Sequence, residues 1–182
     1  MRRYDYDWEA PGATALVAVL EEAERVIGRF RRASTPSGSA GMPAHATVLP
    51  SFVHAGDLRD NDVETIAQLI GRVAPFDVEL ARFGRFEEIG VLYLAPEPRE
   101  TFVELSQALW DAYPEVPFLP EGAQEIVPHV TVASRLPRAE LDAIEAELRP
   151  ELPLRERVER VVLFERGGNG RWAAHAAFPL SA

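Results

Sequence analysis

The sequence predicts a duplicated fold of strands and helices, because the chain carries one short motif twice. His45-Ala46-Thr47-Val48 returns 84 residues later as His129-Val130-Thr131-Val132. The chain holds four histidines, so two such pairs stand out against its composition. Around each copy the same order of elements recurs: strand, helix, motif strand, helix, strand. We therefore expect an internal repeat of about 80 residues, whose pseudo-twofold axis would bring the two motifs face to face.

The first half follows from local patterns. An apolar run predicts a buried strand, and apolar residues at helical spacing (Ala23, Val26, Ile27, Phe30) predict the helix after it. A loop rich in Ser, Gly and Pro leads into the motif strand, and Asn61 with Glu64 is typical of a helix start. The expected elements are a lead-in at 1–12, a strand at 14–20, a helix at 21–32, a loop at 35–43, the motif strand at 44–49, a helix from 61, and strands at 76–83 and 89–95.

The second half repeats that order. A helix is expected where Phe102, Leu105, Leu109 and Tyr113 recur on one face. The run Gly167-Gly168-Asn169-Gly170 predicts a tight turn between the last two strands. The remaining expected elements are a Pro-rich loop at 114–122, the motif strand at 126–133, a helix opened by Leu136-Pro137, and strands at 155–164 and 171–178.

Each motif places two polar side chains together on one side of its strand. Residues i and i+2 of a strand point to the same face. His45 therefore lies beside Thr47, and His129 beside Thr131, while the intervening Ala46 and Val130 point into a core. A single His-x-Thr in a strand is usually structural, with the ring satisfied by a neighbour. The duplication at equivalent positions favours a catalytic role.

This set of side chains suits phosphodiester chemistry. Histidine has an unperturbed pKa near 6.5 and can act as acid or base near neutral pH. Two imidazoles facing each other could activate water and protonate a leaving oxygen, while the two hydroxyls donate to the phosphate oxygens. No metal is needed for such a scheme. A metal site that uses both histidines and a carboxylate is the alternative, but no His-x-x-x-His spacing supports it.

Composition narrows the class of protein. The chain has no cysteine and no lysine, and its net charge is −10. These absences exclude disulfides, thiolate chemistry and catalytic lysines. The negative charge argues against binding to duplex nucleic acid, so a small phosphorylated molecule or an RNA terminus is the expected partner. Without a long apolar run, we expect a cytoplasmic protein that does not bind membranes. We also expect a monomer of one domain, with lobes at about 13–88 and 89–180.

Beyond these patterns, the chain resembles the two-histidine (2H) phosphoesterase superfamily, in particular the 2′-5′ RNA ligase-like proteins and cyclic phosphodiesterases. The resemblance rests on both motifs, with Pro43, Phe52 and Pro128 around them, and on the stretches 91–96 and 170–180. It implies a bilobal α+β fold of two antiparallel sheets with outer helices and a central cleft that receives one motif from each lobe.

The resemblance also implies an activity. His45 and His129 become the acid–base pair, and Thr47 and Thr131 the phosphate donors, with no cofactor. The implied reaction is hydrolysis of a 2′,3′-cyclic nucleotide, ADP-ribose cyclic phosphate or an RNA-end cyclic phosphate. Reversible 2′-5′ RNA ligation and binding of a nucleotide or RNA end without turnover remain alternatives. Further candidate substrate contacts are Phe52 and Trp172, which could stack on a base, and Arg135, which could contact phosphate.

Overall fold

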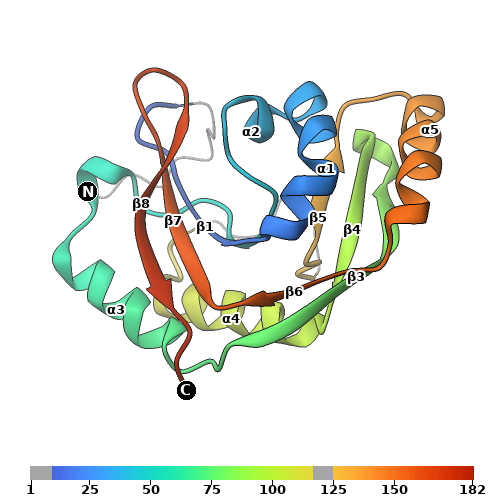
Figure 1. Cartoon of the computed structure of the whole chain (residues 1–182). Helices are drawn as coiled ribbons and strands as arrows, with labels where there is room; N and C mark the ends of the chain where they lie inside the picture. Colours follow the sequence, from blue (N-terminus) through green and yellow to red (C-terminus); the bar gives the residue numbers. More distant parts are fainter. Residues whose placement is uncertain (1–9, 117–124) are drawn as a thin grey trace.

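In this computed structural model the chain is described over residues 10–116 and 125–182, and both ranges are built from short strands and helices (Figure 1). The strands are β1 (Thr14–Val19), β2 (His45–Leu49), β3 (Phe76–Phe86), β4 (Val91–Glu97), β5 (Val130–Ala133), β6 (Leu154–Val158), β7 (Arg160–Arg166) and β8 (Trp172–Pro179). The helices are α1 (Glu21–Ser34), α2 (Pro36–Ser39), α3 (Asp60–Ile70), α4 (Arg99–Ala112) and α5 (Arg138–Leu148), with 3₁₀ turns η1 (Ala55–Asp57), η2 (Glu87–Ile89) and η3 (Arg149–Glu151).

The strands form two antiparallel sheets of four, which confirms the expected α+β class. Sheet A has the order β2-β1-β7-β8, and sheet B has the order β5-β4-β3-β6. The first motif lies in β2, and the second begins with His129 immediately before β5. Both strands are at the edge of their sheets, and each pairs with the strand that begins its half of the chain. The two edge strands, β2 and β5, contact each other between the sheets. The two motifs are thus brought together, as the pseudo-twofold arrangement requires.

The predicted boundary between the lobes, at residues 88 and 89, does not separate the strands of the two sheets. Strand β3 belongs to the first half of the chain but pairs with β4 and β6 in sheet B. The strand predicted at 155–164 is two strands, β6 in sheet B and β7 in sheet A, which are separated at Glu159. The hairpin from β3 to β4 explains the first difference, because a short turn joins antiparallel neighbours more readily than strands in separate sheets.

The helices interlock the two halves. Helix α1, which follows β1, contacts the motif strand β5 of the other half, and α4, which follows β4, contacts the motif strand β2. In Figure 1, α1 accordingly lies between β1 of one sheet and β5 of the other. Each motif strand is therefore supported by a helix from the opposite repeat. This exchange couples the position of one motif to the sequence of the other half.

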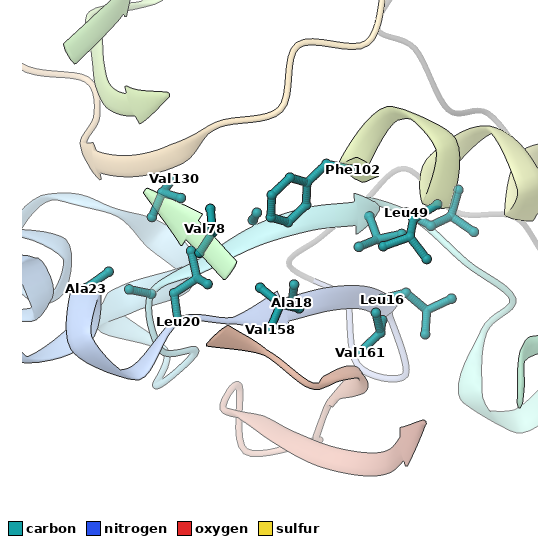
Figure 2. Close-up of a cluster of buried hydrophobic side chains, with 14 of the residues drawn as sticks. Leu16, Ala18, Leu20, Ala23, Leu49, Val78, Phe102, Val130, Val158 and Val161 are labelled. Carbon is teal, nitrogen blue, oxygen red and sulfur yellow. The ribbon is translucent and has the colours of Figure 1, made fainter. Parts of the chain in front are cut away.

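A shared hydrophobic core joins the sheets. Figure 2 shows Leu16 and Ala18 of sheet A in the same cluster as Val78, Val130 and Val158 of sheet B. Alternate residues of β1 point the other way, into a smaller cluster that includes Val17, Met42 and Trp172. The strand is buried on both faces because each face meets its own apolar layer, which matches its continuous apolar sequence.

Several local expectations change in the structure. Helix α3 begins at Asp60 rather than Asn61, and Asp62 accepts a 3.0 Å hydrogen bond from the Arg59 backbone N–H at this helix start. The loop predicted at 35–43 contains the short helix α2, which Thr35 caps by accepting from the Gly38 N–H. Parts of the expected lead-in and of the loop at 114–122 lie outside the described residues. Within the described ranges, no helix is long and apolar enough to cross a membrane.

Candidate active site

The first motif lies at the start of β2. His45 is 7% exposed, whereas Thr47, two residues further along the same face, is partly exposed. Ala46 and Val48 point the opposite way and are fully buried in the shared core. The alternation expected from the sequence is therefore confirmed, since the apolar residues anchor the strand and leave the imidazole and the hydroxyl on its other side.

The second motif has the same arrangement. His129 immediately precedes β5, and Thr131 lies within it, with both side chains partly exposed. Val130 and Val132 are fully buried. Thr131 is the cross-strand partner of Tyr93 on β4. The Tyr93 side chain therefore lies on the same face of sheet B as the motif's polar groups.

Both imidazoles are held by the same hydrogen bond. Nδ1 of His45 lies 2.7 Å from the carbonyl oxygen of Pro43, and Nδ1 of His129 lies 2.7 Å from that of Val127. A carbonyl oxygen can only accept, so Nδ1 carries the proton in both rings. The nitrogen left for chemistry is Nε2, which is unprotonated when the ring is neutral. The hydrogen bond fixes the tautomer and the plane of each ring.

Burial keeps both histidines neutral. The pKa of His45 is lowered to about 3, chiefly by desolvation and also by the positive charges of Arg31 and His129, against the opposing effect of the Pro43 carbonyl. The pKa of His129 is also lowered, by desolvation first and then by Arg31, while its hydrogen bond to Val127 opposes the shift. The repulsion from His129 places the two rings within electrostatic reach of each other. At neutral pH the free protein therefore holds two neutral imidazoles.

A buried arginine links the two motifs. Arg31 of α1 is 1% exposed. Its Nη1 donates to the backbone oxygen of Thr131 at 2.6 Å, and its Nη2 donates to that of Pro43 at 3.2 Å. The Pro43 oxygen is the same atom that accepts from His45 Nδ1. One guanidinium thus touches the segment that orients His45 and the strand that carries Thr131.

A second residue of α1 supports the first motif. Glu24, two helical turns before Arg31, accepts from the Ala44 N–H at 2.7 Å through Oε2, and its Oε1 accepts from Arg32. Gly28 lies between Glu24 and Arg31 on the same helix face, and a Cβ there would overlap the Glu24 carboxylate. Helix α1 therefore binds both polar atoms of the Pro43–Ala44 peptide group, which immediately precedes His45: Arg31 donates to its carbonyl oxygen, and Glu24 accepts from its N–H.

Aromatic rings surround His129. The Phe86 ring meets the imidazole edge-on with centroids 5.1 Å apart, and the Tyr93 ring lies 5.6 Å from it. Phe86 and Tyr93 also contact each other at 4.7 Å. A Cβ at Gly84 would overlap the Tyr93 ring, so the ring can lie here only because residue 84 has no side chain. Both aromatic residues are partly exposed.

Comparison with known proteins identifies the family. A sequence model of the 2′-5′ RNA ligase superfamily matches residues 19–170, a range that contains both motifs and most of the chain. The chain belongs to this superfamily. Its curated relatives include proteins named as candidate phosphoesterases from Geobacillus sp. (strain WCH70) and from Shouchella clausii (strain KSM-K16). The first is 26% identical over 144 residues, which cover 75% of this chain and 78% of that protein. The second is 24% identical over 144 residues, which cover 78% and 82%.

Solved structures support the same fold. The structure of Escherichia coli LigT complexed with NADP⁺ has a TM-score of 0.60 and 16% identity, covering 94% of this chain and 99% of that chain. A Thermus thermophilus protein, TT0787, has a TM-score of 0.59 and 19% identity, covering 92% and 97%. At these identities the likeness concerns the fold alone. Together with the family match, it identifies the chain as a LigT-like member of a phosphoesterase superfamily.

Two predicted substrate contacts of this superfamily member need correction. Phe52 is 2% exposed and packs edge-on against Tyr113 at 4.8 Å. Trp172 is 6% exposed and lies in the smaller core cluster. Both rings are buried in the hydrophobic core clusters, so neither presents a face to a base. Local sequence does not show this burial, since the residues that cover each ring come from distant parts of the chain.

Arg135 differs from those two residues. It is exposed just beyond β5, and its backbone is left-handed, with φ of 59°. Within the described residues it has no salt bridge of the kind that most arginines here form, so its contact with substrate stays a prediction.

Sequence reasoning missed Arg31, Phe86 and Tyr93. A signal for Arg31 was present, because it lies four residues after Ile27 on the apolar face predicted for the helix. A charged residue at such a position needs a buried partner. For Phe86 and Tyr93 the only signal was their place on neighbouring strands, and their approach to His129 depends on the pairing of β4 with β5.

Proposed function

We propose that this protein is a metal-independent phosphodiesterase that hydrolyses a cyclic ribose phosphate. The substrate class is a 2′,3′-cyclic nucleotide, ADP-ribose cyclic phosphate or an RNA-end cyclic phosphate. The observation that carries the proposal is the equivalence of His45 and His129, each bonded through Nδ1 to the carbonyl two residues earlier at 2.7 Å. Membership in the superfamily supports it independently.

Each catalytic group acts through one atom in the proposed mechanism. In the proposed reaction Nε2 of His129 accepts a proton from water, and the resulting hydroxide attacks phosphorus. Nε2 of His45 donates a proton to the departing 3′ oxygen as its bond to phosphorus breaks, which leaves a 2′-phosphomonoester. The hydroxyls of Thr47 and Thr131 donate to the non-bridging oxygens, where negative charge grows in the transition state.

The acid needs a proton that neither ring carries in the free protein at neutral pH. A bound phosphodiester carries one negative charge, and a nearby opposite charge raises the pKa of an imidazole. Substrate binding would therefore be coupled to proton uptake by one ring. The second ring stays neutral because a charged neighbour lowers the pKa of an imidazole, and the two rings lie within electrostatic reach of each other. One binding event thus creates the acid–base pair.

The aromatic surface next to His129 supports a nucleoside substrate. Phe86 and Tyr93 are partly exposed and contact the imidazole, whereas Phe52 and Trp172 are enclosed. Aromatic side chains bind bases by stacking, with little dependence on sequence. The proposal therefore places the base against Phe86 or Tyr93. The net charge of −10 favours a single phosphorylated end over a long duplex.

A substrate panel tests the proposal. The purified protein is incubated with 2′,3′-cyclic mononucleotides, ADP-ribose cyclic phosphate and 2′-5′-linked oligomers, with and without EDTA. We expect phosphomonoester release from a cyclic phosphate, unchanged by EDTA and absent from His129→Ala. The matched control is His175→Asn, since His175 is exposed on β8 and bonds Glu165. Activity that is lost on chelation and restored by a divalent ion would overturn the metal-free mechanism. Binding without product on all substrates would indicate a binding protein.

A further inference from the structure

Arg31 is buried without a salt bridge to a carboxylate among the described residues, although buried charges are usually paired in this way. It is 1% exposed, and none of the salt bridges among the described residues includes it. Glu24 raises its pKa by charge, but burial dominates and lowers that pKa to about 10. The Glu24 oxygens are instead bonded to Arg32 and Ala44. The Nε of Arg31 also has no hydrogen-bond partner.

Stability alone does not explain such a residue. Burying a charge without a paired carboxylate is unfavourable, and an apolar side chain of similar size would avoid that penalty. Residues that break a stability rule in this way are expected at functional sites. The contacts of Arg31 point to that role, because both of its acceptors, the oxygens of Pro43 and Thr131, belong to the segments that carry the motifs.

We propose that Arg31 is a positioning residue for both motifs and supplies the buried positive charge that favours an anionic phosphate between them. Its two Nη groups join the Pro43 carbonyl, which orients His45, to the backbone of Thr131, which lies 100 residues after Arg31 in the sequence. The hydrogen bonds of the guanidinium among the described residues go to backbone oxygens, and the side chain is buried, so Arg31 acts through the motifs and not by touching substrate. This inference rests on the proposed function for the identity of the anion.

The same charge influences both imidazoles. Arg31 lowers the pKa of His45 and that of His129. Among the described residues, the other charges in this network are His129, which also lowers the pKa of His45, and Glu24, which acts on Arg31. An arriving phosphate would offset the effect of Arg31 at both rings. The arginine thus helps burial to keep both imidazoles neutral in the free protein, and its own charge is not neutralised by a salt bridge among the described residues.

Three variants on α1 test the assignment. Arg31→Met removes the charge and the bridge with little change in volume, and Arg31→Lys keeps the charge but lacks the two-pronged guanidinium. Arg25→Met is the matched control, because Arg25 is exposed and pairs with Glu22 on its own helix. The measurements are the NMR titration of His45 and His129, the affinity for inorganic phosphate, and kcat and KM on the best cyclic phosphate.

We expect Arg31→Met to raise both histidine titration midpoints, to weaken phosphate binding, and to lower kcat/KM by about tenfold to a hundredfold, as misplaced catalytic groups do. Arg31→Lys should keep low midpoints and near-normal phosphate affinity but lose kcat. A folded Arg31→Met with wild-type midpoints and phosphate affinity would overturn the proposal.

Two further outcomes are also decisive. If Arg31→Met does not fold, an Arg31→Lys variant with wild-type kcat and KM overturns the positioning role. If the wild type turns over no cyclic phosphate, the proposed function fails, and the histidine titrations and phosphate affinities still decide the role of Arg31.

Discussion

His45 and His129 lie 84 residues apart in the sequence, yet each donates from Nδ1 to the carbonyl oxygen two residues before it, at 2.7 Å in both cases. The two rings therefore share one tautomer and present the same nitrogen, Nε2. Their environments differ, since His45 is more deeply buried and His129 is flanked by Phe86 and Tyr93. Equivalent hydrogen bonds in unequal surroundings suit a pair in which one ring is the acid and the other the base.

Loss of either histidine should remove most of the activity. We expect His45→Ala and His129→Ala each to lower kcat by at least about a hundredfold, the contribution of an acid or base group. The double variant should be little worse than the more impaired single variant, because groups that act as a unit are not additive. Steady-state kinetics on folded variants provide the measurement. Full turnover by folded His45→Ala would show that the paired mechanism is wrong.

The threonines should matter less than the histidines. Thr47→Ala and Thr131→Ala each remove a neutral donor from a partly exposed position, where water can replace part of the lost interaction. We expect a smaller fall in kcat/KM than for either histidine, and Thr→Ser should recover most of it by restoring the hydroxyl. Comparison of the Ser and Ala variants checks this. Equal losses for Ser and Ala would assign the effect to the methyl group and to packing.

The pH dependence of the rate should distinguish the free protein from its complex. Because the pKa of each histidine lies below 6.5 in the free protein, both limbs of the kcat/KM profile should lie on the acid side of about pH 6.5. Bound phosphate raises these pKa values, so the kcat profile should be displaced to higher pH. Complete pH–rate profiles on one substrate provide the test, and the apparent values belong to the coupled pair. A kcat/KM optimum well above pH 7 would contradict this prediction.

The free energy of unfolding should depend on pH because His45 is buried and neutral in the folded protein. Its folded pKa, about 3, lies below the unfolded value of about 6.5, so the unfolded chain binds the proton first as the pH falls. Its contribution to the free energy of unfolding is complete above about pH 6.5 and is lost progressively toward lower pH. In His45→Gln, the slope of unfolding free energy between about pH 6 and 5 should be shallower by up to about 1.4 kcal/mol per pH unit. Urea unfolding at several pH values measures the slope, with His175→Asn as control. Identical slopes for wild type and His45→Gln would mean that His45 is protonated as readily folded as unfolded.

Tyr93 and Phe52 should fail in different ways when each is changed to Ala. Loss of Tyr93 should raise KM for cyclic nucleotides by an amount worth about 1–3 kcal/mol, the contribution of one stacked base. Loss of the buried Phe52 should instead lower stability by about 3–5 kcal/mol, with KM unchanged in the protein that remains folded. Kinetics and denaturation of both variants separate the two effects. If KM rose in Phe52→Ala and not in Tyr93→Ala, Phe52 would be the residue that contacts the base, as the sequence predicted.

The sequence was sufficient for the arrangement of each motif because that arrangement depends on local spacing. A strand repeats every two residues, so His45 with Thr47, and His129 with Thr131, share a face wherever the strand is placed. Most element boundaries could also be predicted from local patterns. Helix α5 begins just after Leu136-Pro137, and the turn at 167–170 joins β7 to β8, as expected. The predicted boundary between lobes failed because sheet membership is not local. Strands β7 and β8 belong to the second half of the chain but join β1 and β2 in sheet A, a long-range pairing that no local pattern indicates.

The sequence by itself determined that the chain carries two copies of one motif, and which side chains of each copy share a face. Only the tertiary structure decided what surrounds them. Arg31 reaches Thr131 across 100 residues of chain, Tyr93 reaches His129 through the pairing of β4 with β5, and Phe52 is enclosed by Tyr113 at the C-terminus of α4. The physical reason is that periodicity acts over a few residues, while burial and electrostatics depend on every group that the fold brings within a few ångströms.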